Sequence, residues 1–161
     1  MSSAESIPQS VSDRALGVRL FNETWDLIDL PDRTEDETAL MIHKAHASIY
    51  HWLQSPDCKS RNAAIGEWLL ARVYSILRMG EPALFHARRC LNICEAGKVE
   101  DWVTASAHEG LARAAAAAGD AALFATHFDE AQRLVSAIAD PDERAQIESD
   151  LAAEPWFGMR R

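Results

Sequence analysis

Alternation of apolar and polar residues with a period of two is nearly absent from the chain, and runs of β-branched residues are few. From residue 60 onward the sequence is dominated by Ala, Leu, Glu and Arg, which all favour helices. Within the segment 41–53, apolar residues gather on one face when they are placed at 100° per residue. This face consists of Met41, Ala45, Ile49, Trp52 and Leu53. The pattern predicts amphipathic helices, with this stripe directed at the core.

Helix-breaking and helix-capping residues divide the chain into seven predicted helices. Their expected ranges are 12–29, 34–54, 60–79, 81–96, 99–118, 121–139 and 141–153. Pro31 follows the first helix, Gly80 follows the third, and Pro141 begins the last. Because every connection is short, successive helices must be antiparallel neighbours. The fold class is therefore expected to be all-α, either a bundle or a stack of helical hairpins.

The whole chain, residues 1–161, is expected to be a single all-helical domain. Residues 1–11 would form a flexible N-terminus, 141–153 a helix that caps the last exposed face, and 154–161 a tail. The apolar cluster Pro155-Trp156-Phe157 is expected to pack back onto the last helix or onto a second subunit. The sequence lacks an apolar run long enough to cross a bilayer and the features of a secretory signal, so we expect a cytoplasmic protein.

The hairpin stack is favoured by a spacing of mostly small residues that occurs twice. The residues at this spacing are Ala71, Tyr74, Ala83 and Cys90, and then Ala112, Ala115, Phe124 and Ala131. It resembles the tetratricopeptide repeat over residues 63–138, and the whole chain looks like a group of bacterial tetratricopeptide-like proteins. The two units lie 41 residues apart, where the family repeats at about 34, so the turn between them must be longer. The resemblance implies a fold and brings no activity.

In tetratricopeptide arrays the inner helices line a concave groove, and the resemblance carries two sets of residues to that groove. They are Trp68, Arg72 and Ser75 in the first unit, and Glu109, Arg113 and Ala116 in the second. The guanidinium groups of Arg72 and Arg113 could hold a peptide carboxylate or acidic side chains in bidentate fashion, with Trp68 as an apolar surface beside Arg72. The alternative is that both arginines pair with carboxylates of the chain itself, such as Glu67 or Glu109.

Histidines are concentrated in the second predicted helix, where His43, His46 and Tyr50 share a face at positions i, i+3 and i+7. Two histidines one turn apart can chelate a transition metal or share a proton, and the tyrosine could act as an acid or a third ligand. Glu67 or His108 would be the additions from nearby helices. Neither H-E-x-x-H nor Glu-x-x-His occurs in the sequence. The alternative is a structural role, with histidine as a hydrogen-bonding spacer.

The formal net charge of −9 argues against nonspecific binding to nucleic acid or to an anionic membrane. The charge is uneven, because segment 59–98 has 7 basic and 3 acidic residues whereas 1–58 has 4 and 10, and 99–155 has 3 and 12. The basic segment could dock an acidic partner, or neighbouring helices could neutralise it. The three cysteines form no C-x-x-C pair, and Cys90 and Cys94 are expected to be buried thiols.

The sequence supports three functional hypotheses. The first is a non-catalytic scaffold that binds a protein or peptide, which could be acidic, through the groove. The second is a protein that binds a small molecule or a transition metal at the histidine face and could be an enzyme. The third, compatible with either, is a homodimer formed by the apolar surfaces of the first helix and the tail. Phosphate-binding glycine motifs and nucleophile motifs are missing from the sequence, so no cofactor is expected and the non-catalytic hypothesis is favoured.

Overall fold

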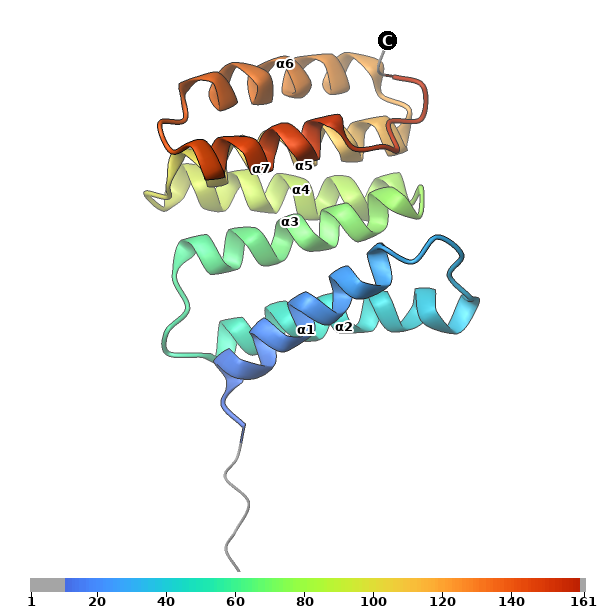
Figure 1. The fold of residues 1–161 in the computed structure, drawn as a ribbon, viewed down its shortest axis with the longest axis vertical. Helices are drawn as coiled ribbons and strands as arrows, with labels where there is room; N and C mark the ends of the chain where they lie inside the picture. Colours follow the sequence, from blue (N-terminus) through green and yellow to red (C-terminus); the bar gives the residue numbers. More distant parts are fainter. Residues whose placement is uncertain (1–10, 160–161) are drawn as a thin grey trace, which may run out of the picture.

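The computed structural model describes residues 11–159, so the expected flexible N-terminus lies almost wholly outside the described residues. Within them the chain forms seven helices and no strands (Figure 1). The helices are α1 (Asp13–Ile28), α2 (Glu35–Gln54), α3 (Ser60–Ile76), α4 (Gly80–Ala96), α5 (Asp101–Ala118), α6 (Ala121–Ala137) and α7 (Pro141–Ala152). The all-α prediction is confirmed, and the helix ends lie within three residues of the expected ones.

Local capping chemistry explains where several helices begin and end. The Ser12 hydroxyl accepts a hydrogen bond from the backbone N–H of Ala15 at the start of α1. At the start of α2, Thr34 and Glu37 form a reciprocal capping box. Gly119 ends α5 with φ 79°, a left-handed conformation in which glycine avoids the strain of a side chain. These caps are encoded within a few residues of each helix end, which is why the sequence predicts them.

The helices pack as successive hairpins, α1 with α2, α3 with α4 and α5 with α6, and α7 packs against both α5 and α6. The odd-numbered helices also contact one another in the order α1, α3, α5, α7. In the described part of the chain the backbones of the even-numbered helices do not approach one another in this way, although the rings of His46 on α2 and His86 on α4 are in contact. Figure 1 shows the hairpins following one another along the long axis of the molecule. The odd-numbered helices therefore form one continuous row.

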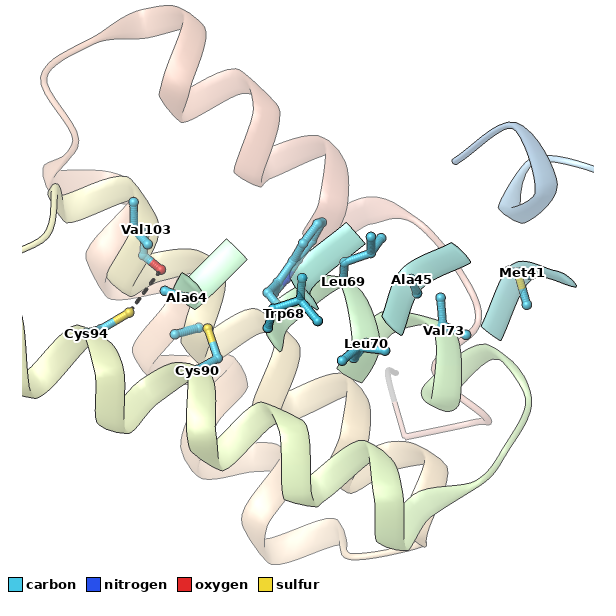
Figure 2. Packing of buried hydrophobic residues seen from close by; sticks show 12 residues of the cluster. Met41, Ala45, Ala64, Trp68, Leu69, Leu70, Val73, Cys90, Cys94 and Val103 are labelled. Atoms are coloured by element: carbon cyan, nitrogen blue, oxygen red, sulfur yellow. Dashed lines mark hydrogen bonds between the residues drawn. The ribbon is translucent and has the colours of Figure 1, made fainter. Parts of the chain in front are cut away.

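The main core lies between α2, α3, α4 and α5. Met41 and Ala45 of α2 meet Leu69 and Val73 of α3, and all four side chains are fully buried (Figure 2). On α4, the expectation of buried cysteine thiols is confirmed, because Cys90 and Cys94 are both buried and neither is in a disulfide. A second core lies between α5, α6 and α7. None of the helices in the described region is long and apolar enough to cross a membrane.

The C-terminal tail folds back onto the molecule, and the ring contacts of Trp156 are with α5 and α6, where the sequence suggested the last helix or a second subunit. Trp156 is fully buried, and its ring lies against Phe124 and Phe128 of α6 at centroid distances of 5.7 and 5.2 Å. The Arg113 guanidinium covers the same ring at 4.0 Å from its centroid. The tail is thus part of the second core and does not offer Trp156 to another subunit.

Candidate functional site

An open groove runs along the row of odd-numbered helices. Each of the four helices contributes side chains to a hollow of ≈ 530 Å³, including Trp25 of α1, Trp68 of α3, Trp102 of α5 and Ile147 of α7. A second hollow of ≈ 280 Å³ adjoins it and is lined almost wholly by apolar atoms. The two hollows share Phe21, Ile65 and Trp102, while Val18 and Trp52 line only the second. We call the two together the aromatic groove.

Helical spacing and two glycines place the aromatic rings. On α1, Val18, Phe21 and Trp25 follow one another at three and four residues and so lie on one face of the helix. A Cβ atom at Gly110 would lie 2.8 Å from Trp68 Cδ1, and one at Gly17 would lie 2.8 Å from Trp52 Cδ1. Only glycine lets the neighbouring backbone approach these rings so closely. The result is a groove wall of indole edges.

One end of the aromatic groove opens onto a basic region formed by Arg14, Lys59 and Arg61. These residues line a hollow of ≈ 420 Å³ that shares Trp52, Arg61 and Asn62 with the apolar hollow. Arg61 pairs with Glu100 at 2.8 Å, whereas Arg14 and Lys59 are exposed and form no ion pair within residues 11–159. We call this region the basic mouth. Asp57 lines the same hollow, so three basic side chains and one acidic side chain lie at this end of the groove. The end is positive on a protein of negative net charge.

The other end of the aromatic groove is acidic. Asp29, which follows the last residue of α1, and Asp150 of α7 both line it. Asp150 is only 8% exposed, its nearest cation is Arg72 at 4.0 Å, and the amide of Gln146 reaches it at 3.5 Å. Burial raises the pKa of Asp150, and the Glu109 carboxylate raises it further, against the opposing effect of Arg72. Asp150 is therefore a poorly satisfied acceptor at the groove floor.

Behind this floor, a buried polar cluster is centred on Glu109. Its carboxylate accepts hydrogen bonds from Trp68 Nε1 at 2.9 Å, Arg72 Nη1 at 3.0 Å and Arg113 Nε at 2.7 Å. Burial by itself would raise the pKa of Glu109, but Arg113 and Arg72 hold it below its ordinary value. Glu109 therefore stays ionised and neutralises charge in the interior.

This cluster corrects the prediction that two arginines grip a ligand in the groove. Arg72 is 6% exposed and Arg113 is inaccessible, so neither guanidinium can serve as an open anion site. Both pair with Glu109, which is the alternative that the sequence left open. Ser75 is also buried and donates to the carbonyl of Ala71. Of the residues expected in the groove, only Trp68 lines it.

The histidine face of α2 is also built differently from the prediction. His46 Nε2 lies 2.9 Å from the Tyr74 hydroxyl, and its ring packs edge-on against His86 of α4. Tyr50 instead packs against the ring of His51. His43 is exposed but close enough to His46 to contribute to its lowered pKa, for which burial and then His86 are the larger causes. His43, His46 and Tyr50 do not converge on one point.

The true neighbours of His46 come from α3 and α4. Glu67 is buried and accepts hydrogen bonds from His86 Nδ1 and Arg89 Nε, both at 2.7 Å. The sequence suggested Glu67 as an addition to the histidine face but missed Tyr74, His86 and Arg89, since no local pattern links them to α2. Within the described part of the chain, no group of three or more His, Cys, Asp or Glu residues is arranged to hold a metal ion.

No protein-family model, no curated protein and no solved structure matches this chain. A function can therefore be argued only from its own geometry. The feature that offers most to a ligand is the aromatic groove, with its basic mouth at one end and Asp29 and Asp150 at the other.

Proposed function

We propose that this protein is a non-catalytic binding module of the tetratricopeptide-like kind, which holds an apolar segment of a partner protein in the aromatic groove. The observation that carries this proposal is the distribution of tryptophan. The chain has five tryptophans, and four of them line the groove. They are Trp25, Trp52, Trp68 and Trp102. Contiguous apolar surface of this kind on a helical protein is typical of an interaction site.

The physical reason is that indole side chains bury large area at little conformational cost. Such side chains dominate the binding free energy of many interfaces when a partner removes them from water. In the groove the rings are already fixed, because Trp25 lies 5.9 Å from Trp68 and Trp68 is hydrogen-bonded to Glu109. A partner segment therefore meets a surface that needs little ordering.

Charge at the ends of the groove narrows the chemistry of the partner. Arg14 and Lys59 of the basic mouth are exposed beside the apolar hollow, so acidic side chains next to the apolar segment would be attracted there. Asp29 and Asp150 would favour a donor or a basic side chain at the opposite end. We therefore infer a peptide segment that is acidic at one end and has large apolar side chains in its middle.

A displayed library of random twelve-residue peptides, selected on the untagged protein, tests this function. We expect the selected peptides to combine large apolar residues with Asp or Glu on one side. Labelled copies should bind the Val18→Glu variant at least about tenfold more weakly, which corresponds to about 1.4 kcal/mol. Val18 is 42% exposed on the groove wall, so the substitution leaves the core intact. Fluorescence anisotropy would measure the affinities.

Two matched controls sharpen this test. Phe85→Glu places the same charge on an exposed position of α4 that lies outside the groove, and it should bind as the native chain does. Lys59→Glu should lower the affinity for peptides with an acidic end more than Arg88→Glu does, which reverses an exposed charge on α4.

Equal binding by the native chain and Val18→Glu would overturn the proposal. Size-exclusion chromatography over a range of concentrations would show whether a second copy occupies the groove instead.

A further inference from the structure

The acidic end of the aromatic groove holds a carboxylate with little compensation. Asp150 lines the hollow of ≈ 530 Å³ and is only 8% exposed. Its contacts with the Gln146 amide at 3.5 Å and with Arg72 Nη2 at 4.0 Å are longer than the about 2.7–2.9 Å of a strong charge-assisted hydrogen bond. Burial and the Glu109 carboxylate raise the pKa of Asp150, and Arg72 does not offset them. Asp150 can therefore accept further hydrogen bonds from a ligand in the hollow.

The walls beside Asp150 are aromatic. Trp25, Trp68 and Trp102 line the same hollow. The face of an indole ring is electron-rich and attracts cations, and a planar guanidinium group can also stack on it. Within the molecule, the guanidinium of Arg72 already lies 5.7 Å from the centroid of the Trp25 ring. Indole rings and a carboxylate in one hollow favour an organic cation as the ligand.

The charges behind the hollow do not oppose such a ligand. Arg72 and Arg113 both pair with Glu109, at 3.0 and 2.7 Å. With Asp150 ionised, these two guanidinium groups and two carboxylates balance one another. Asp29 is exposed and lines the same hollow, so it leaves the acidic end with one negative charge. A monovalent cation would neutralise that charge.

The order of side chains along α1 suits a cation at the end of a short apolar chain. Phe21, Trp25 and Asp29 all line the hollow and follow one another at intervals of four residues. They therefore lie on one side of the helix, with a rise of about 6 Å from each to the next. An alkyl chain against Phe21 and Trp25 would place its charged end beside Asp29 and Asp150.

We propose that the acidic end of the aromatic groove binds a guanidinium group carried on a short alkyl chain, as an arginine side chain of the partner segment or as a free alkylguanidine. Because the site is part of the aromatic groove, the arginine form rests on the proposed function. A guanidinium group is planar and weakly hydrated, and it can donate two parallel hydrogen bonds to a carboxylate while its face stacks on an indole ring. An ammonium group holds its water more strongly, so it loses more on entering this hollow.

Titration of the full, untagged chain with butylguanidinium tests the site without a peptide, because nuclear magnetic resonance resolves the indole N–H signals. We expect saturable shifts of Trp25, Trp68 and Trp102, with a dissociation constant on the order of 1 mM for so small a ligand. Trp52 and Trp156 do not line this hollow, and their signals should change little. Butylurea has the same shape without the charge and should cause no saturable shift. Butylammonium should bind several-fold more weakly than butylguanidinium.

Three variants locate the charge that holds the cation. Asp150→Asn keeps the shape of the side chain, so circular dichroism should show native helicity while the affinity for butylguanidinium falls at least about tenfold. Asp29→Asn should lower the affinity less, because Asp29 is exposed. Asp26→Asn removes an exposed carboxylate of α1 that does not line the hollow, and it should bind as the native chain does. The comparison of butylguanidinium with butylurea on the native chain tests the need for charge even if Asp150→Asn does not fold.

Unchanged affinity for butylguanidinium in folded Asp150→Asn, or equal binding of butylurea by the native chain, would refute the proposal. Binding of butylammonium as tight as that of butylguanidinium would refute the choice of a guanidinium group. Absence of butylguanidinium binding, together with peptide binding that Val18→Glu weakens, would refute the site and leave the proposed function standing.

Peptides selected on the groove distinguish the two sources of the guanidinium group. Citrulline is a neutral isostere of arginine, so its introduction in place of arginine should lower peptide affinity about tenfold if the partner segment supplies the cation. Selected peptides without arginine, in a chain that still binds butylguanidinium through Asp150, would assign the site to a free alkylguanidine.

Discussion

At the scale of single residues, Glu109 is the centre of the buried polar cluster, because three other side chains donate hydrogen bonds to it. It is inaccessible, and it alone joins Trp68 in the groove wall to the buried guanidinium groups of Arg72 and Arg113. A buried charge of this kind does not stabilise by itself, because desolvation opposes the attraction. Its removal leaves two neighbouring cations with only the more distant carboxylate of Asp150 to balance them. Glu109 therefore fixes the groove wall and neutralises the interior at once.

Replacement of Glu109 tests that role. Glu109→Gln keeps the shape of the side chain and removes its charge, so the free energy of unfolding should fall by about 3–5 kcal/mol. Urea denaturation followed by circular dichroism would measure the loss. Glu130→Gln, which breaks the exposed pair with Arg133, is the matched control and should leave the urea midpoint unchanged. A native midpoint for Glu109→Gln would mean that the cluster is not charge-balanced as described.

Three histidines predict how stability depends on pH. The pKa values of His46, His108 and His127 are all lowered from 6.5, chiefly by burial. Below pH 6.5 the unfolded chain therefore binds protons that the folded chain excludes, and stability falls as the solution is acidified through the window between 6.5 and the lowered values. Urea midpoints at pH 7.5, 6.5 and 5.5 would show this fall. A His108→Gln, His127→Gln double variant should show a smaller fall, and an equal one would contradict the assignment.

At the scale of elements, two arginines complete helix ends from outside the helix. Arg113 donates to the carbonyls of Asp150, Ala153 and Pro155, at 2.8, 3.2 and 3.1 Å, where α7 gives way to the tail. Arg33 does the same for the end of α1, through the carbonyls of residues 27, 28 and 30. The last carbonyls of a helix have no partner within it. These contacts therefore fix the course of the chain beyond both helices.

The packing of the tail can be tested at Trp156. Trp156→Ala would leave a cavity between Phe124 and Phe128, so we expect a loss of about 3–5 kcal/mol in the free energy of unfolding. Trp156→Phe should cost much less, because it keeps an aromatic ring and removes a buried indole N–H that has no partner among the described residues. Urea denaturation compares the two. Equal losses would show that a smaller aromatic ring does not replace the indole ring of Trp156 in this core.

The helices and their ends were predictable because their signals are local. The Thr34 and Glu37 capping box and the glycine at 119 each act within one turn. The groove residues were only partly predictable, because a helical wheel gives the direction of a side chain and not its depth. Arg113 of α5 lies on the side of the helix that was expected to face the groove, but α7 and the tail cover its guanidinium group. His46 meets a tyrosine 28 residues away, a contact that no short pattern encodes.

At the scale of the whole molecule, each hairpin contacts only its neighbours in the stack, as far as residues 11–159 are concerned. Stability in such an array is approximately a sum over units and the interfaces between them. The α1–α2 hairpin packs on the rest of the chain mainly through α3, with a ring contact between His46 and His86 of α4. It is tied internally by the hydrogen bond from Ser48 to the carbonyl of Gly17. Within the described chain, the hairpin therefore has a neighbouring unit on one side only.

This position at the end of the stack has a consequence for how a partner would bind in the groove. Trp25 and Phe21 belong to the hairpin, while Trp102 and Asp150 belong to the far side of α3. Because the two walls belong to different units of the stack, with α3 between them, a small rotation of the hairpin relative to the other helices would change the width of the groove. A molecule bound between the walls would contact both of them and so hold the α1–α2 hairpin in one position relative to the other helices. The same rotation would let the groove accommodate peptide segments whose side chains differ in size.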